Sequence, residues 1–183
     1  MIEASLLPPP TVGEFIAALK AATDGENVGS KNELYADIGD QGVEVGSRGT
    51  KCTRTSSVKA ILEFEVVRQD KGLTAATLDD YFELFAKFVV DPALMSENVD
   101  TQREIAQQRE AMCKRANVTM HKLSTTTLRT YMNSIAAVYN RTPGVHHKII
   151  SSSTMWFPNF NDYFTACSKR NKKVAAVKEA EKD

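Results

Sequence analysis

A helical repeat in residues 127–140 constrains the fold of this chain more than any other feature. Apolar side chains recur there at the i, i+3/i+4 and i+7 spacing that shares one face of an α-helix, namely Leu128, Tyr131, Met132, Ile135, Val138 and Tyr139. The pattern predicts a short helix with one buried face. Arg129 falls in its first turn, where a cation meets the positive end of the helix dipole. We therefore expect Arg129 to have an anionic partner, a carboxylate or a phosphate.

Helical signals also dominate the chain from residue 56 onward. Ser56–Ser57 fits an N-cap before an apolar-periodic run, and Thr77 followed by two aspartates fits a second helix start. Asp91–Pro92 predicts the end of that second helix, because the residue before a proline disfavours the helical region. The fold class is therefore predicted to be mainly α.

The expected organisation has four segments. Residues 1–24 form an N-terminal arm and a short helix, and residues 25–55 form an irregular Gly-rich segment in which 41–46 is compatible with a short β-hairpin. Residues 56–168 form the helical core. Residues 169–183 form a charged tail, either a weak helix or a mobile arm. Three consecutive prolines at 8–10 favour an extended N-terminal arm.

Composition excludes several classes of protein. The 183 residues carry 23 basic and 23 acidic side chains, and this zero net charge argues against a general duplex-DNA binder. Three widely spaced cysteines fit neither a disulfide framework nor a zinc site and suggest a reducing compartment. No apolar run approaches the length of a membrane span, and no signal peptide is evident. We expect no membrane partner.

No catalytic or metal-binding pattern stands out. Phosphate-binding glycine motifs, zinc-protease motifs and activated Cys–His arrangements are missing from the sequence. The neighbouring His146 and His147 lack a third ligand at a sensible spacing. We therefore expect no enzyme activity, no catalytic residue, no metal and no cofactor.

Three motifs lie between residues 78 and 164. The first runs from Thr127–Leu128–Arg129 to Tyr139–Asn140, the second is the aromatic-flanked Asp162, and the third is Ser96. Together they resemble motifs in the coat proteins of flexuous filamentous plant RNA viruses of the potexvirus, carlavirus and potyvirus groups. The resemblance covers roughly residues 78–164. It departs from the family in that Asn161 stands between Phe160 and Asp162, and the segment after Phe164 is short.

The resemblance implies an RNA-binding groove formed by Arg129, Asp162 and Ser96. An arginine can hold a phosphate with two donors while a carboxylate orients it, although the same pair also fits a structural ion pair between two helices. The predicted helix from 98 to 115 adds further cations, Arg103, Arg109 and Arg115. Those cations fit either RNA contacts or a solvated face paired with Glu104 and Glu110.

The resemblance therefore implies a coat subunit that polymerises helically around single-stranded RNA without sequence specificity. In the family, N-terminal arms pack on neighbouring subunits, which implies a helical homopolymer assembled in the host cytoplasm and found in the virion. The alternative prediction is a helical adaptor or scaffold subunit of a cellular complex. In that case the aromatic stripe of Phe82, Phe85 and Phe88 would be partly an interface.

Overall fold

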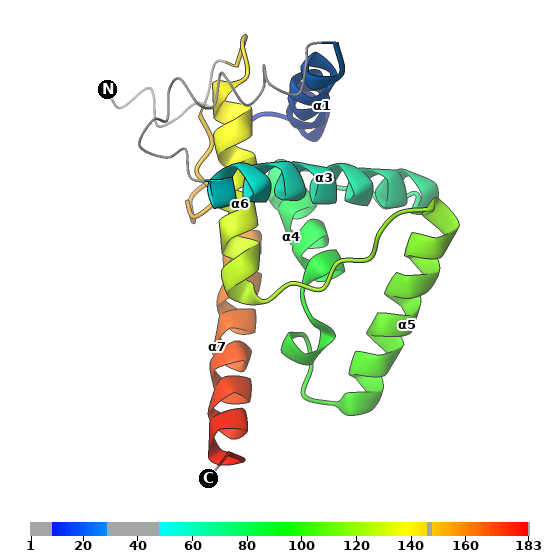
Figure 1. Cartoon of the computed structure of the whole chain (residues 1–183), viewed down its shortest axis with the longest axis vertical. Coiled ribbons are helices and arrows are strands. Elements are labelled where there is room, and N and C mark those ends of the chain that lie inside the picture. Colours follow the sequence, from blue (N-terminus) through cyan, green and yellow to red (C-terminus); the bar gives the residue numbers. More distant parts are fainter. Residues whose placement is uncertain (1–8, 29–47, 146–147, 183) are drawn as a thin grey trace. The chain divides into compact units, whose positions relative to one another are not determined.

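Helix is the only extended regular structure in the residues that the computed structural model describes, which are 9–28, 48–145 and 148–182. The elements are α1 (Val12–Val28), α3 (Arg48–Lys71), α4 (Leu78–Val89), the 3-10 turn η2 (Pro92–Leu94), α5 (Val99–Ala116), α6 (Thr125–Arg141) and α7 (Pro158–Ala180). Figure 1 follows them along the chain. The prediction of a mainly α fold is confirmed. The suggested hairpin at 41–46 and the first eight residues lie outside the described part.

Several expected boundaries hold because local signals decide them. The Thr77 side chain accepts a hydrogen bond from Asp80 N and caps α4, and Asn98 caps α5 by accepting from Asp100 N and Thr101 N. Pro92 follows the end of α4, as its ring requires. Gly72, with φ of 67°, follows the end of α3 in the left-handed conformation that glycine adopts readily.

Three helices are longer than expected. α1 runs through the Asp24–Gly25 pair to Val28, and α3 begins at Arg48 instead of at Ser56–Ser57. Ser57 lies inside α3, where its hydroxyl donates to Arg54 O at 2.9 Å, so it is not an N-cap. α7 continues through the charged tail to Ala180. The boundaries expected at residues 24, 55 and 168 therefore all fall inside helices.

Backbone contacts divide the chain into two units. The first comprises Met1–Leu62 and Thr130–Ser151. Within it, the rings of Phe15 on α1 and Tyr139 on α6 lie 5.4 Å apart, and both side chains are buried. Asn140 accepts from Ile149 N at 2.7 Å and donates to Ile149 O at 2.9 Å. This last residue of the 127–140 motif thus anchors the loop after α6.

The second unit comprises Glu63–Arg129 and Ser152–Asp183. Its helices α4 and α7 run in the same direction, α5 runs in the opposite one, and residues 117–124 return from the end of α5 to the start of α6 (Figure 1). Leu123 N donates to Val89 O at 2.6 Å and Asp91 N donates to Leu123 O at 2.9 Å, which forms a single parallel bridge between residues 90 and 123.

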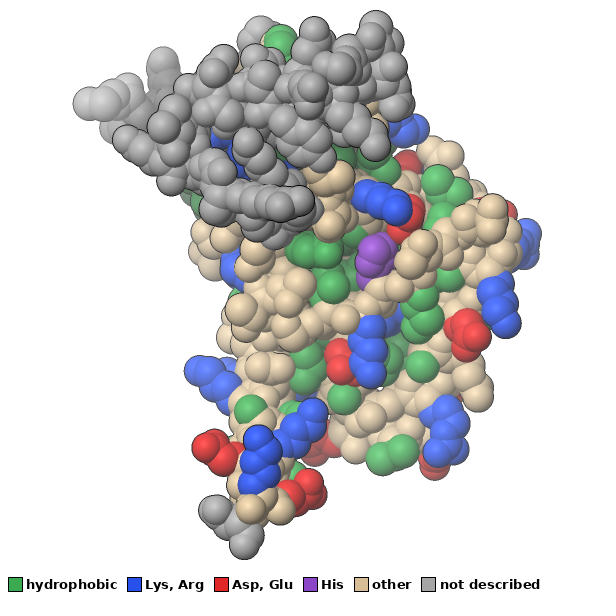
Figure 2. Space-filling view, in the orientation of Figure 1, with side chains coloured by type: hydrophobic (Ala, Val, Ile, Leu, Met, Phe, Trp, Pro, Cys, Tyr) green, Lys and Arg blue, Asp and Glu red, His purple; other side chains and the backbone are tan. Residues whose placement is uncertain are grey.

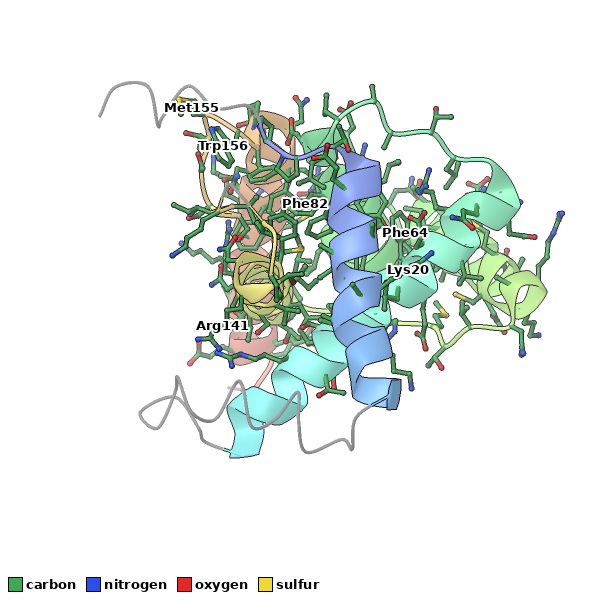
Figure 3. All side chains as sticks on the ribbon, turned by 90° about the horizontal axis from the view of Figure 1, so that it is seen from above. Lys20, Phe64, Phe82, Arg141, Met155 and Trp156 are labelled. Atoms are coloured by element: carbon green, nitrogen blue, oxygen red, sulfur yellow. The ribbon has the colours of Figure 1, made fainter. Side chains whose placement is uncertain are left out.

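Aromatic rings fill the interior of the second unit. Phe82 stacks on Phe157 with centroids 4.9 Å apart, and Phe64 packs edge-on against Phe85 at 5.6 Å. Figure 3 shows Phe64 and Phe82 among the packed side chains, whereas Met155, which is 67% exposed, lies at the outside. Full burial of each ring contributes about 1.5–3 kcal/mol.

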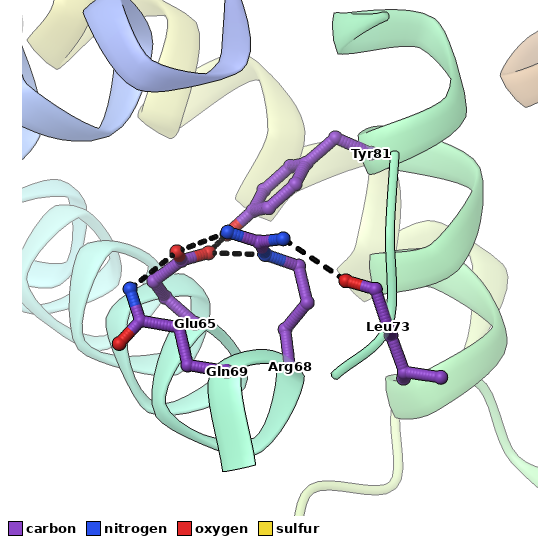
Figure 4. Close-up of polar contacts among 5 residues, drawn as sticks. All are labelled: Glu65, Arg68, Gln69, Leu73 and Tyr81. Atoms are coloured by element: carbon purple, nitrogen blue, oxygen red, sulfur yellow. Dashed lines mark hydrogen bonds and ion pairs between the residues drawn. The ribbon is translucent and has the colours of Figure 1, made fainter. Parts of the chain in front are cut away.

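A polar network joins α3 to α4 beside this interior (Figure 4). The buried Glu65 carboxylate accepts from Arg68 Nη2 at 2.6 Å and Nε at 2.8 Å, from Tyr81 Oη at 2.8 Å and from Gln69 Nε2 at 3.1 Å. Arg68 Nη1 also donates to Leu73 O at 3.0 Å, which holds the turn after α3. A buried carboxylate is stabilising only when its oxygens are paired in this way.

Candidate anion-binding site

Helix α6 begins earlier than the sequence suggested, and this changes the position of Arg129. Ser124 Oγ accepts from Thr127 N at 3.2 Å, and Ser124 O accepts from Leu128 N at 2.9 Å. Since α6 starts at Thr125, Arg129 is its fifth residue and lies just beyond the first turn. The helix dipole therefore opposes the Arg129 charge less than we expected. Buried Leu128 fixes the start of the helix, and the neighbouring Arg129 side chain is half-buried.

The Arg129 guanidinium lies on an aromatic platform supplied by α7. Its central carbon is 4.0 Å from the centroid of the Phe164 ring and 5.8 Å from that of the Phe160 ring. A cation on the face of an aromatic ring gains about 0.5–2 kcal/mol, more when water is excluded. The platform also holds the planar guanidinium in one orientation.

Asn161 is the polar partner of Arg129. Arg129 Nη2 donates to Asn161 Oδ1 at 3.1 Å, while Asn161 Nδ2 donates to Phe157 O at 2.8 Å. The second bond fixes the amide so that its oxygen faces the guanidinium. The neighbouring Asp162 is exposed, and among the described residues it forms no ion pair with Arg129. The residue that orients Arg129 is therefore neutral.

The site leaves part of a positive charge without a counter-charge. Arg129 Nη1 is buried and has no hydrogen-bond partner, and Arg129 forms no ion pair with the side chains described in residues 9–23, 54–145 and 148–182. Burial lowers the pKa of Arg129 below its ordinary value, but a guanidinium stays charged at neutral pH. A buried donor without a partner costs about 1–3 kcal/mol. An anion bound at Nη1 would remove that cost.

Three other predicted RNA-binding residues lie elsewhere. Ser96 Oγ accepts from Asn98 N at 3.1 Å, just before α5. Arg103 is exposed on α5 with its Nη1 3.7 Å from Asp100 Oδ1, and Arg115 Nε lies 3.0 Å from Asp70 Oδ2. None of the three has a recorded bond to Arg129 in the described residues. The arrangement therefore joins neither Ser96 nor Asp162 to Arg129.

Arg109, another predicted RNA-binding residue, is instead buried, with 3% of its surface exposed. Its Nη2 donates to Lys87 O at 2.9 Å and approaches Met95 Sδ at 3.4 Å. Lys87 O lies in the last turn of α4, where carbonyl groups lack helical partners and a cation is favourable. Arg109 thus caps the C-terminal end of α4. The polar and charged residues around it in the sequence of α5 gave no sign of this role.

The sequence singled out Asp162 in the 160–164 segment, but the residues of this segment that contact Arg129 are others. Phe160, Asn161 and Phe164 are the groups that touch Arg129. The available signal was their i, i+1 and i+4 spacing, which places them on adjoining faces of one helix. Asn161 was interpreted as a departure from the family pattern, whereas it supplies the acceptor.

Other chemistry is not evident in the described residues. No three His, Cys, Asp or Glu side chains among them converge as a metal site, and no helix there is long and apolar enough to cross a bilayer. His146 and His147 lie outside the described residues. Comparisons of the chain with protein-family models, with curated proteins and with solved structures found no match.

Proposed function

We propose that this chain is a viral coat subunit that polymerises helically around single-stranded RNA, with Arg129 as its central phosphate contact. The observation that carries the proposal is the buried Arg129 Nη1, a cationic donor with no partner in the described residues. Arg68, by contrast, has its guanidinium paired with the Glu65 carboxylate in the same unit. Arg109 Nη1 is also buried without a hydrogen-bond partner, but Arg109 differs from Arg129 in that its Nη2 caps α4 by donating to Lys87 O.

The geometry suits a backbone contact rather than a base-reading one. Phe164 holds one face of the guanidinium and Asn161 accepts from Nη2, so Nη1 keeps its donors for a phosphate oxygen, which reaches this buried nitrogen only when the neighbouring side chains move. A phosphate carries charge at every nucleotide regardless of sequence, which a coat covering a whole genome requires. The zero net charge of the chain lets many subunits stack without strong repulsion.

Self-assembly through the N-terminal arm completes the proposal. The arm's proline run is suited to docking on a neighbouring subunit, because an already extended segment loses less entropy on binding. A head-to-tail contact of this kind generates an open helix when the rotation does not close. Pro10, at the end of the run, is buried.

No specific observation favours the adaptor alternative. Its expected interface was the stripe of Phe82, Phe85 and Phe88, and all three rings are buried within the second unit. A docking stripe for a cellular partner would present exposed apolar side chains.

Two measurements on the purified chain test the proposal: electron microscopy for filaments, and the ratio of absorbance at 260 and 280 nm for bound nucleic acid. We expect flexible rods with elevated absorbance at 260 nm, and Arg129→Ala should lose RNA, because one bond to a charged group is worth about 1.5–3 kcal/mol per subunit. Arg141→Ala is the matched control, since Arg141 is an exposed arginine at the other end of α6. Circular dichroism checks that both variants fold. Nucleic-acid-free discrete particles, or equal RNA content in both variants, would overturn the proposal.

A further inference from the structure

One face of α7 continues from the Arg129 site toward the C-terminus. Asn161, Thr165, Ser168 and Lys172 follow one another at spacings of four, three and four residues, which places them on a single helical face. Asn161 bonds Arg129 at one end of this row. Lys172, at the other end, is exposed. At 1.5 Å per residue the row is about 16 Å long.

The charge of α7 favours an anion along this row. Residues 163–178 contain five cations and no carboxylate, namely Lys169, Arg170, Lys172, Lys173 and Lys178. Figure 2 shows Lys and Arg side chains over the C-terminal half of this helix, with acidic ones among them toward its end. The side chains between Asn161 and Lys172 on the row are small hydroxyls, so they leave room for a strand to approach the helix.

The cations in the C-terminal half of α7 differ in whether they already have a hydrogen-bond or ion-pair partner. Arg170 Nη1 donates to Met95 O at 3.0 Å and Leu94 O at 3.2 Å, and so caps the turn η2. Lys173 Nζ lies 3.6 Å from Glu97 Oε1. Lys172 has no ion pair recorded in the described part of the chain, and it is the cation that continues the Asn161 face.

From this arrangement we infer that the RNA strand runs from Arg129 along the Asn161–Ser168–Lys172 face of α7, with Lys172 holding a second phosphate. This inference rests on the proposed function and adds a direction and a residue to it. Two cations separated by three helical turns track the backbone of several nucleotides without reading bases. The path does not use the α5 cations Arg103 and Arg115, which lie beside Asp100 and Asp70.

A pair of adjacent lysine variants tests the path. The probe is a fluorescent oligouridylate bound to the full chain over a range of salt concentrations. Lys172→Ala should weaken binding about three- to tenfold and reduce the slope of log affinity against log salt by about one, because one phosphate contact is lost. Lys173→Ala removes a neighbouring exposed cation on another face and should change the slope by much less.

The possible failures are distinguishable. Equal effects of Lys172→Ala and Lys173→Ala, with binding lost in Arg129→Ala, would overturn the path but leave the proposed function intact. Wild-type affinity in Arg129→Ala would overturn the proposed function and the path with it. If Lys172→Ala weakens binding and Lys172→Arg does not, the path is supported. Arginine keeps the positive charge at this position, so the result would show that the charge is what the RNA contacts.

Discussion

The carboxylate of Asp79 on α4 accepts a hydrogen bond from the backbone N–H of Phe160 on α7, at 2.9 Å, across 81 residues of sequence. It also accepts from Asn159 N at 3.1 Å. Helix α7 has Phe157 at its N-cap and no capping side chain of its own, so Asp79 replaces the missing local cap. The same contact fixes the turn that carries Asn161 and the Phe160 ring beside Arg129.

Replacing Asp79 should therefore destabilise the fold. Asp79→Ala leaves two backbone donors of the first turn of α7 unpaired, one of them buried, and we expect a loss of about 2–3 kcal/mol in the free energy of unfolding. Urea denaturation followed by circular dichroism measures it. Asp80→Ala, which removes the neighbouring carboxylate of α4, should cost less than about 1 kcal/mol. Equal losses in the two variants would contradict the capping role.

Glu65 should make stability depend on pH in the acid range. Burial alone would raise the pKa of this carboxyl, but hydrogen bonds from Arg68, Tyr81 and Gln69 outweigh burial, and the pKa lies below its ordinary value of 4.5. The folded state then prefers the ionised form. Its stabilisation is complete above the unfolded pKa and is lost as pH falls below 4.5 through the folded pKa.

Urea denaturation at neutral and acid pH measures this contribution. Glu65→Gln should lower stability at neutral pH by about 2–3 kcal/mol, and its stability should fall less steeply than that of the wild type below about pH 4.5. Glu83→Gln breaks the i, i+4 pair with Lys87 on the surface of α4 and should cost under about 0.5 kcal/mol at neutral pH. Parallel acid profiles for the wild type and Glu65→Gln would be evidence against the network.

Asn140 should control the protection of the loop after α6. Asn140→Ala removes both bonds to the Ile149 backbone, costs about 1–2 kcal/mol and speeds hydrogen exchange at the Ile149 amide. Asn140→Asp keeps the acceptor for that amide and loses the donor, so it should retain much of the protection. Unchanged exchange at Ile149 in Asn140→Ala would show that the loop is held by other contacts.

Local signals predicted the helices but not their partners. Thr77 and Pro92 act within three residues of their own position, and both mark helix boundaries in the structure where the sequence placed them. The start of α3 was wrong because Ser56–Ser57 resembles a cap, yet the Ser57 hydroxyl bonds back to Arg54 O inside a longer helix. A cap and a back-bonding serine look alike until the preceding residues are known to be helical.

The positions of Arg109 and Arg129 could not be predicted from the sequence, because contacts between residues far apart in the chain decide them. Arg109 was grouped with exposed cations because its neighbours on α5 are polar, but its guanidinium reaches Lys87 O, 22 residues earlier. Likewise the partner of Arg129 is Asn161 and not Asp162, since one helical position separates an inward amide from an outward carboxylate. Register of this kind depends on how α6 and α7 pack.

The neutral partner of Arg129 has a consequence for acid tolerance. The guanidinium keeps its proton throughout the range in which carboxylates and histidines titrate, and Asn161 does not titrate at all. A phosphodiester also keeps its charge over that range. An anion held by Arg129 would therefore not be released by mild acidification, although the Glu65 network weakens there. In the proposed filament, a fall in pH would therefore lower the stability of the subunit fold before it weakened the contact between Arg129 and the RNA phosphate.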